Sequence, residues 1–256
     1  MQEKRKFGFR VALLSVIWVL LLVLCLAMLS ILAAFYATNN QGISSLSWAG
    51  YTIEKNSNPH FEVIGVNASW VVPQVNASAG NGYSSAWIGV GGELDKTLIQ
   101  VGTEQDVVNG QASYSAWYEL LPSFAVRLTS ISVSPGDTII ASLNLVNSGT
   151  NMWSIQISDA TNGQGFSKNV VYNSTRSSAE WIVERPTVGN QTSTLSDFGS
   201  ITFTGCNVNV NNVTGSITKF AFSKIVMTSG PSTKLAAVSA LTVKGTSFTA
   251  NYLAGS

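Results

Sequence analysis

Short stretches of alternating apolar and polar residues, separated by turn residues, fill the chain from residue 48 to its end. Pro-Gly-Asp at 135–137 and Asn-Gly at 162–163 are typical of the turns between them. We find no helical periodicity in this region and no repeat with a period of about 20–50 residues, which argues against propellers and solenoids. Short alternating strands with a turn about every ten residues predict an all-β sandwich or barrel.

The beginning of the chain has a different composition. Residues 11–37 carry no charge, and four lysines and arginines lie within residues 1–10. A bilayer span needs ~20 apolar residues, whereas the apolar core of a signal peptide has ~7–15. We therefore predict a transmembrane signal anchor over 11–37, preceded by a cytoplasmic tail over 1–10. Cleavage near residues 32–40 is the alternative.

This reading divides the chain into a tail, a span, a linker over 38–47 and a β domain over 48–256. It predicts a single-pass membrane protein whose β domain is extracytoplasmic. Cys25 lies in the predicted span and Cys206 in the β domain, so they cannot pair and the domain must depend on its core. N-glycosylation sequons, compatible with export as a glycoprotein, begin at Asn67, Asn76, Asn173, Asn190 and Asn212.

Several classes of function are disfavoured by composition. The formal net charge of +1 gives no indication of a nucleic-acid partner. His60 is the one histidine, so a zinc site of the usual kind or a Ser-His-Asp triad has little to use. The Gly-rich run at 89–92 is not followed by a helical pattern and reads as a turn rather than a phosphate-binding loop. We expect no metal and no cofactor, and nothing in the sequence indicates an oligomeric state.

Carboxylates and amides remain as candidate catalytic groups. Glu180 and Glu184 share one face of the strand predicted around "AEWIVE", about 13 Å apart, so they cannot form one catalytic centre by themselves. A carboxylate can activate water, and the amide of Gln100, in "TLIQVGTE", can stabilise an oxyanion. The alternative is that these residues lie on solvated strand faces.

Eight short motifs along the chain, in a fixed order, resemble those of a known protein family. The series resembles the glutamic peptidases (eqolisins) in order and spacing: "WAGY" (48–51), "ASWVVP" (68–73), "AWIGVGG" (86–92), "LIQVGTE" (98–104), "YSAWYELLP" (114–122), "GDTI" (136–139), "AEWIVERP" (179–186) and "DFGSITF" (197–203). The resemblance implies a concanavalin-like β-sandwich of two large, bent antiparallel sheets. It also implies an acid-acting endopeptidase whose partner is a protein or peptide substrate.

The resemblance also implies roles for particular residues. It places the family's catalytic glutamine at Gln100, and we assign the family's catalytic glutamate to Glu180 rather than Glu184. Glu180, ionised in acid because hydrogen bonds lower its pKa, takes a proton from water. Gln100 holds that water and donates to the oxyanion. The residues expected to line the substrate groove are Trp87, Trp117, Glu104 and Glu119.

Two departures and two alternatives qualify the resemblance. Gly91 stands where fungal members carry an aspartate, and Leu121 where they have an aromatic residue. A β-sandwich can equally bind or hydrolyse glycans, for which Glu119 and Glu180 would supply the two carboxylates. The remaining alternative is an inactive surface domain of the same fold.

Overall fold

The structure is a computed structural model that describes residues 21–28, 42–55 and 60–255. The chain separates into two compact units, residues 1–41 and 42–256. In the first unit, residues 21–28 are helical. Within the described parts of the chain, no helix has the length and apolar character needed to cross a membrane. Most of the predicted span (11–37) and the whole of the predicted tail (1–10) lie outside the described residues.

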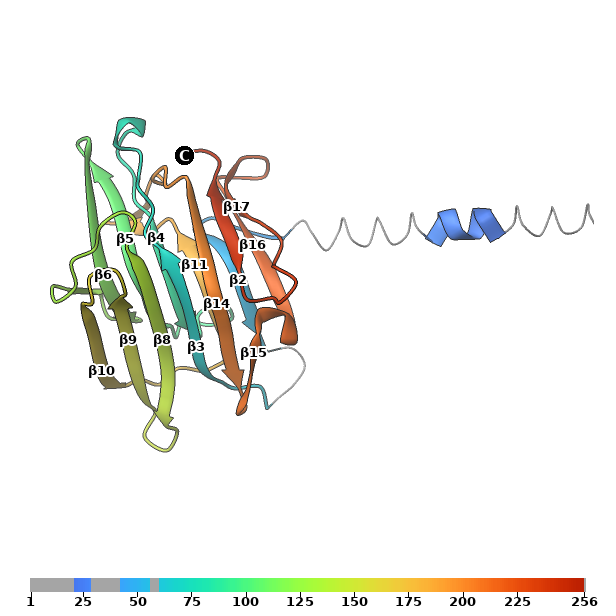
Figure 1. Cartoon of the computed structure of the whole chain (residues 1–256), viewed down its shortest axis with the longest axis horizontal. Helices are drawn as coiled ribbons and strands as arrows, with labels where there is room; N and C mark the ends of the chain where they lie inside the picture. The colour runs from blue at the N-terminus through green and yellow to red at the C-terminus, as the bar shows by residue number, and fades with distance from the viewer. Residues whose placement is uncertain (1–20, 29–41, 56–59, 256) are drawn as a thin grey trace, which may run out of the picture. The chain divides into compact units, whose positions relative to one another are not determined.

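The second unit consists of strands, as the sequence predicts (Figure 1). It begins earlier than predicted, because a short strand forms at Ile43–Ser45, inside the segment expected to be a linker. Two 3-10 turns, η1 (Ala77–Ala79) and η2 (Ile217–Lys219), accompany the strands. The strands are β1 Ile43–Ser45, β2 Trp48–Glu54, β3 Val63–Val71, β4 Ser85–Val90, β5 Ile99–Val108, β6 Gln111–Leu120, β7 Val126–Leu128, β8 Thr138–Asn147, β9 Met152–Asp159, β10 Gly165–Val171, β11 Ser178–Glu184, β12 Thr187–Val188, β13 Gln191–Thr192, β14 Ser200–Val210, β15 Val213–Ser216, β16 Phe222–Thr228, β17 Lys234–Val238 and β18 Phe248–Tyr252.

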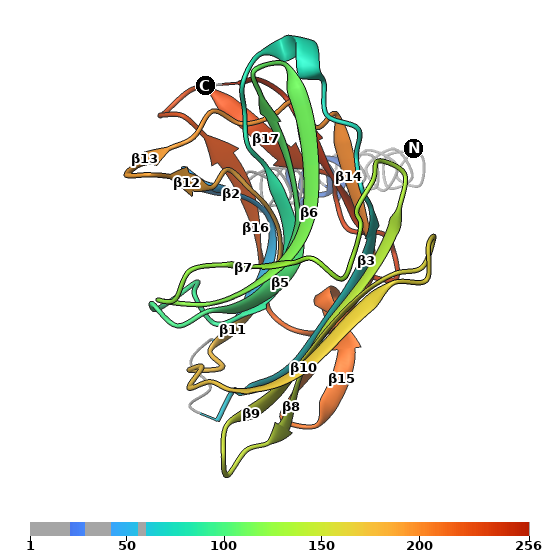
Figure 2. The ribbon, with the colours of Figure 1, turned by 90° about the vertical axis from the view of Figure 1, so that its left-hand side faces the viewer.

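The strands form two layers that pack face to face (Figure 2). One layer has the order β10-β9-β8-β3-β14-β18 and the other β17-β16-β2-β11-β4-β5-β6-β7. Pairing of β17 with β18 joins them, so hydrogen bonding is continuous around one edge and the predicted two sheets are one folded sheet. Neighbours are antiparallel except β1, which pairs in parallel with β16. The predicted all-β antiparallel sandwich is confirmed.

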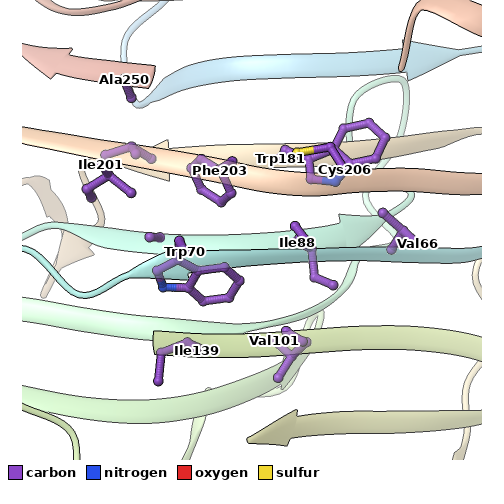
Figure 3. Close-up of a cluster of buried hydrophobic side chains, with 14 of the residues drawn as sticks. Val66, Trp70, Ile88, Val101, Ile139, Trp181, Ile201, Phe203, Cys206 and Ala250 are labelled. Atoms are coloured by element: carbon purple, nitrogen blue, oxygen red, sulfur yellow. The ribbon is translucent and has the colours of Figure 1, made fainter. Parts of the chain in front are cut away.

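The core lies between the two layers and takes alternate residues from each strand. Trp181, Ile88 and Val101 point from β11, β4 and β5 toward Trp70 and Phe203 of the other layer (Figure 3). Fully burying such a side chain is worth about 1.5–3 kcal/mol, so this core can support the domain. The intervening residues of β4, β5, β6 and β11 point to the opposite, concave face, and the candidate site is built there.

Candidate active site

Strand register gathers the candidate residues on one face of four neighbouring strands. β11, β4, β5 and β6 are in register, so side chains at matched positions form rows across the sheet. One row is Glu180, Gly89, Gln100 and Glu119. The next two rows are Ile182, Trp87, Gly102 and Trp117, then Glu184, Ser85, Glu104 and Ser115. Both glutamates of "AEWIVE" and the predicted glutamine therefore share a face, as period 2 requires.

Two glycines make room for the large side chains of these rows. A Cβ on Gly102 would lie 2.5 Å from the Cβ of Trp87, so only glycine lets the indole lie across β5. A Cβ on Gly89 would lie 2.8 Å from Cδ1 of Leu98 and 3.1 Å from Oε2 of Glu180. Close packing around Trp87 thus depends on glycine at both neighbouring positions.

A cavity of about 370 Å³ opens on this face. Its volume falls in the range of ~300–1,000 Å³ typical of ligand sites. The lining residues are Ser85, Gln100, Glu104, Trp117, Glu119, Phe124, Ala125, Glu184, Pro186 and Thr187. Four predicted site residues, Gln100, Glu104, Trp117 and Glu119, are among them, and two, Trp87 and Glu180, are not.

Gln100 is held in one orientation by a carboxylate. It is 4% exposed, and its Nε2 donates a hydrogen bond to Oε2 of Glu119 at 2.5 Å. Glu119 also accepts from the backbone N–H of Ala125. Burial raises the pKa of Glu119, and these two hydrogen bonds oppose the increase. Among the described residues, the buried Oε1 of Gln100 has no hydrogen-bond partner, so its capacity to accept a hydrogen bond is unused.

Glu184 receives its hydrogen bonds from tryptophan side chains. Nε1 of Trp87 donates to Oε2 of Glu184 at 2.8 Å, and the indole of Trp48 also donates to this carboxylate. The two indoles pack edge to face with centroids 5.2 Å apart, which fixes both donors. Burial outweighs these bonds and raises the pKa of Glu184 from 4.5 to about 7. In acidic solution this carboxyl group is therefore neutral.

Glu180 lies in a different environment, and the structure does not bring it to the cavity. Its side chain is 0% exposed, and its carboxyl group lies by Gly89, close to the Leu98 and Trp87 side chains. Burial raises its pKa well above the usual value, the Ser178 hydroxyl opposes this, and the charges of Glu93 and Asp95 add to it. Glu180 is therefore not among the residues that line the cavity, whereas Glu184, the less favoured candidate from sequence, is.

The other predicted groove residues have distinct roles. Trp117 is 7% exposed, and its indole N–H has no partner within the described part of the chain. Trp87 is fully buried and does not line the cavity, but its indole N–H holds the carboxyl group of Glu184, which does. Glu104 accepts a hydrogen bond from the Ser115 hydroxyl.

Sequence reasoning missed two residues: Asp106, on the same strand face as Gln100 and Glu104, and Phe124, which lines the cavity. Asp106, which follows Glu104 on the same face of β5, has its pKa raised to about 7 by burial and by the charge of Glu104. The Ser84 backbone N–H and the charge of Arg127 oppose this shift. Phe124 lines the cavity although its side chain is 94% exposed. Period 2 from Gln100 through Glu104 would have indicated Asp106, but no sequence pattern indicates that the loop with Phe124 reaches the cavity.

Metal-ligating side chains and the loop at Gly91 complete the description of the site. In residues 21–28, 42–55 and 60–255, no group of three or more His, Cys, Asp or Glu side chains could hold a metal ion. Gly91, where the resemblance departs from the fungal pattern, has φ +86° and a position for Cβ only 2.4 Å from the Thr97 carbonyl oxygen. A side chain at this position would require a different conformation of the loop between β4 and β5. Glycine at position 91 is therefore required by the backbone conformation seen here.

Comparison with known proteins agrees with this geometry. The chain matches the model of the Peptidase A4 family over residues 46–252. Aspergillopepsin-2 of Aspergillus niger is 31% identical over 191 residues, which are 65% of this chain and 65% of that protein. The chain thus spans just under two thirds of that relative's length.

Solved structures give the same result for the fold. Aspergilloglutamic peptidase from Aspergillus niger superposes with a TM-score of 0.58 and 29% identity, covering 67% of this chain and 99% of that one. Scytalido-glutamic peptidase, solved with a transition-state analog inhibitor, gives a TM-score of 0.68 at 22% identity, covering 82% and 99%. The strand order, the row of Gln100 and its partners, and the match over residues 46–252 lead to one conclusion: this chain belongs to the Peptidase A4 family, the glutamic peptidases.

Proposed function

We propose that this protein is an acid-acting endopeptidase that hydrolyses peptide bonds with Gln100 and Glu184. The observation that carries the proposal is that an oriented amide and a proton-carrying carboxyl group line the same cavity. Family membership supports it, as do the names of the relatives, which are peptidases. The glycan alternative loses its proposed carboxylate pair, because Glu119 lines the cavity and Glu180 does not.

Gln100 positions water and stabilises charge. One N–H of its amide is committed to Glu119, which leaves Oε1 and the second N–H for the reaction. Oε1 accepts a hydrogen bond from the attacking water, and the N–H donates to the scissile carbonyl oxygen as negative charge develops there. Because Glu119 and the sheet fix the amide beforehand, this stabilisation needs no reorganisation during the reaction.

Glu184 transfers protons, beginning as a neutral acid. As water bonds to the carbonyl carbon, Glu184 gives its proton to the carbonyl oxygen and takes a water proton on its other oxygen. In the second step it protonates the leaving nitrogen, the C–N bond breaks, and a hydroxyl proton returns to the carboxyl group. Products are a carboxylic acid and an amine, and Glu184 ends neutral as it began.

This assignment replaces the predicted ionised base. The sequence led us to expect that hydrogen bonds lower the pKa of the catalytic glutamate, but burial dominates at Glu184 and raises it to about 7. A carboxyl group that must be protonated loses activity as pH rises through about 7, so the raised pKa still favours work in acid.

Full-length protein in detergent, incubated with denatured protein and a peptide library from pH 2 to 8, tests the proposal. We expect internal peptide bonds to be cleaved below pH 7, and Gln100→Ala to lower kcat/KM about a hundredfold by removing an oxyanion donor. Cleavage of polysaccharide but not peptide would favour the glycan alternative. A fully active Gln100→Ala variant would overturn the mechanism, and a folded but inert wild type would indicate an inactive domain.

We also propose that residues 11–37 anchor the protein in a membrane, with the β domain on the extracytoplasmic side. The support is in the sequence: a long uncharged run preceded by basic residues. Alkaline extraction of membranes should leave the full chain in the pellet, and added protease should reach the β domain only from the outer side. Release into the soluble fraction, with a new N-terminus near residues 32–40, would identify a cleaved leader instead.

A further inference from the structure

Tyr172, between β10 and β11, places its hydroxyl between the two strands that carry Gln100 and Glu119. The β5–β6 pairing ends at Ile99 and Leu120, and one more bond runs from the Leu121 N–H to the Leu98 carbonyl at 3.0 Å. The bond that would complete this pair, from the Leu98 N–H to the Leu121 carbonyl, is replaced by the phenol. Leu98 N–H donates to the Tyr172 oxygen at 2.7 Å, and the Tyr172 hydroxyl donates to the Leu121 carbonyl at 2.8 Å.

This bridge stands at the start of the segment that walls the cavity. Leu121 begins the connection to β7, in which Phe124 and Ala125 line the cavity. The Ala125 N–H donates to Glu119, and Glu119 accepts from the amide of Gln100. A continuous series of hydrogen bonds and short chain connections therefore leads from Tyr172 to the amide that performs the proposed chemistry.

The position of Tyr172 is fixed independently of the cavity. Its backbone N–H donates to the Asn151 carbonyl at 3.0 Å, and its own carbonyl accepts from Nε1 of Trp153 at 3.2 Å. Trp153 is fully buried on β9, in the layer opposite the site. The hydroxyl thus connects the cavity wall to the rigid core of the other layer.

We propose that Tyr172 is a positioning residue: its hydroxyl fixes segment 121–125, and through the Ala125 N–H and Glu119 it fixes the Gln100 amide. This inference rests on the proposed function for its effect on catalysis. Its structural part does not, because the bridge and the series of bonds exist whatever the cavity binds. Removing the hydroxyl leaves two partly buried backbone groups without their partner and frees the wall to move.

Tyr172→Phe in the full-length protein is the test, because it removes one oxygen and keeps the ring. Tyr51→Phe is the matched control: that hydroxyl donates to the Ser239 carbonyl, also at 2.8 Å, and does not line the cavity. We expect Tyr172→Phe to lower kcat/KM about tenfold, mainly through kcat, because misplacing the amide weakens transition-state contacts. Tyr51→Phe should change kcat/KM by less than about twofold. Wild-type kcat and KM in Tyr172→Phe would overturn the proposal.

Amide hydrogen exchange separates this inference from the proposed function. In Tyr172→Phe the Ala125 amide should exchange faster together with that of Leu98, although Ala125 does not touch the phenol; unchanged Ala125 exchange would refute the coupling. If the variant does not fold, hydrogen exchange in the wild type still tests the coupling. The proposal requires that the Leu98 and Ala125 amides exchange through one shared opening event, with the same dependence on denaturant. If the wild type cleaves no peptide, the proposed function fails while the exchange result stands.

Discussion

The two ends of β11 carry the same residue type in opposite environments. Glu180 is fully buried near the Leu98 side chain, whereas Glu184 lines the cavity and accepts hydrogen bonds from two indoles. Both pKa values are raised by burial, so the difference between the two is access and not charge state. A carboxyl group acts on a substrate only where donors hold it and the surface is open.

The largest expected effect comes from replacing Glu184, the proposed proton-transfer residue. Glu184→Gln keeps the shape of the side chain but cannot transfer a proton, so kcat should fall about a thousandfold. Glu180→Gln, the matched control on the same strand face, should retain kcat within about threefold, because this side chain does not line the cavity. Progress curves on one peptide at pH 4 would measure both. An inert Glu180→Gln beside an active Glu184→Gln would restore the assignment made from sequence.

Truncating Leu98, which packs near the Glu180 carboxyl group, should let water reach Glu180 and make its environment more like that of Glu184. Leu98 is 3% exposed, and truncating a buried leucine commonly costs about 2–5 kcal/mol, so we expect Leu98→Ala to lower the free energy of unfolding by about 3 kcal/mol. Water admitted to the space should lower the raised pKa of Glu180. Urea unfolding measures the first effect, and NMR titration of carboxyl carbons measures the second. An unchanged Glu180 pKa would show that Leu98 is not what excludes water.

The pH dependence of stability tests whether both ends are buried as neutral acids. A carboxyl group whose pKa is raised on folding contributes stability fully below the unfolded pKa of about 4.5, and loses it as pH rises through the folded pKa of about 7 at Glu184. After allowance for partial exposure, Glu184 alone should contribute about 2–3 kcal/mol.

Thermal unfolding monitored by circular dichroism should therefore give a higher Tm at pH 4 than at pH 7. Asp106, whose pKa is also raised to about 7, adds to the slope with the same sign. Glu184→Gln should flatten the slope, since an amide does not titrate. A Tm that rises from pH 4 to pH 7 would contradict the described burial.

The smallest expected effect concerns the indole N–H groups that donate hydrogen bonds to Glu184. Trp48→Phe keeps an aromatic ring against Trp87 but removes the indole N–H of Trp48. In the wild type this N–H donates to Glu184 and holds the pKa of Glu184 lower than burial alone would. The pKa of Glu184 should then rise by roughly half a unit, so activity persists to slightly higher pH. The alkaline limb of kcat/KM against pH measures this shift, and a limb that moves to lower pH would exclude Glu184 as the titrating acid.

Four residues singled out from the sequence, Gln100, Glu104, Trp117 and Glu119, line the cavity. Gln100 stood out as an amide between apolar strand residues, and the motif series placed Glu104, Trp117 and Glu119 in the groove they line. The choice of Glu180 over Glu184 stays a prediction from sequence that the cavity lining does not favour, because parity along a strand gives the face of a side chain but not what covers that face. Leu98, the neighbour of Glu180, comes from a loop end 82 positions away, and nothing in "AEWIVE" indicates it.

The sequence by itself determined the all-β class, the alternation that separates core from groove face, and the family. These follow from interactions between residues a few positions apart and from motif order. Only the tertiary structure decided that Glu184 rather than Glu180 reaches the cavity, that the sheet is continuous, and that Tyr172 bridges β5 and β6. Those properties depend on register, bending and loop contacts between distant segments, which no local period encodes.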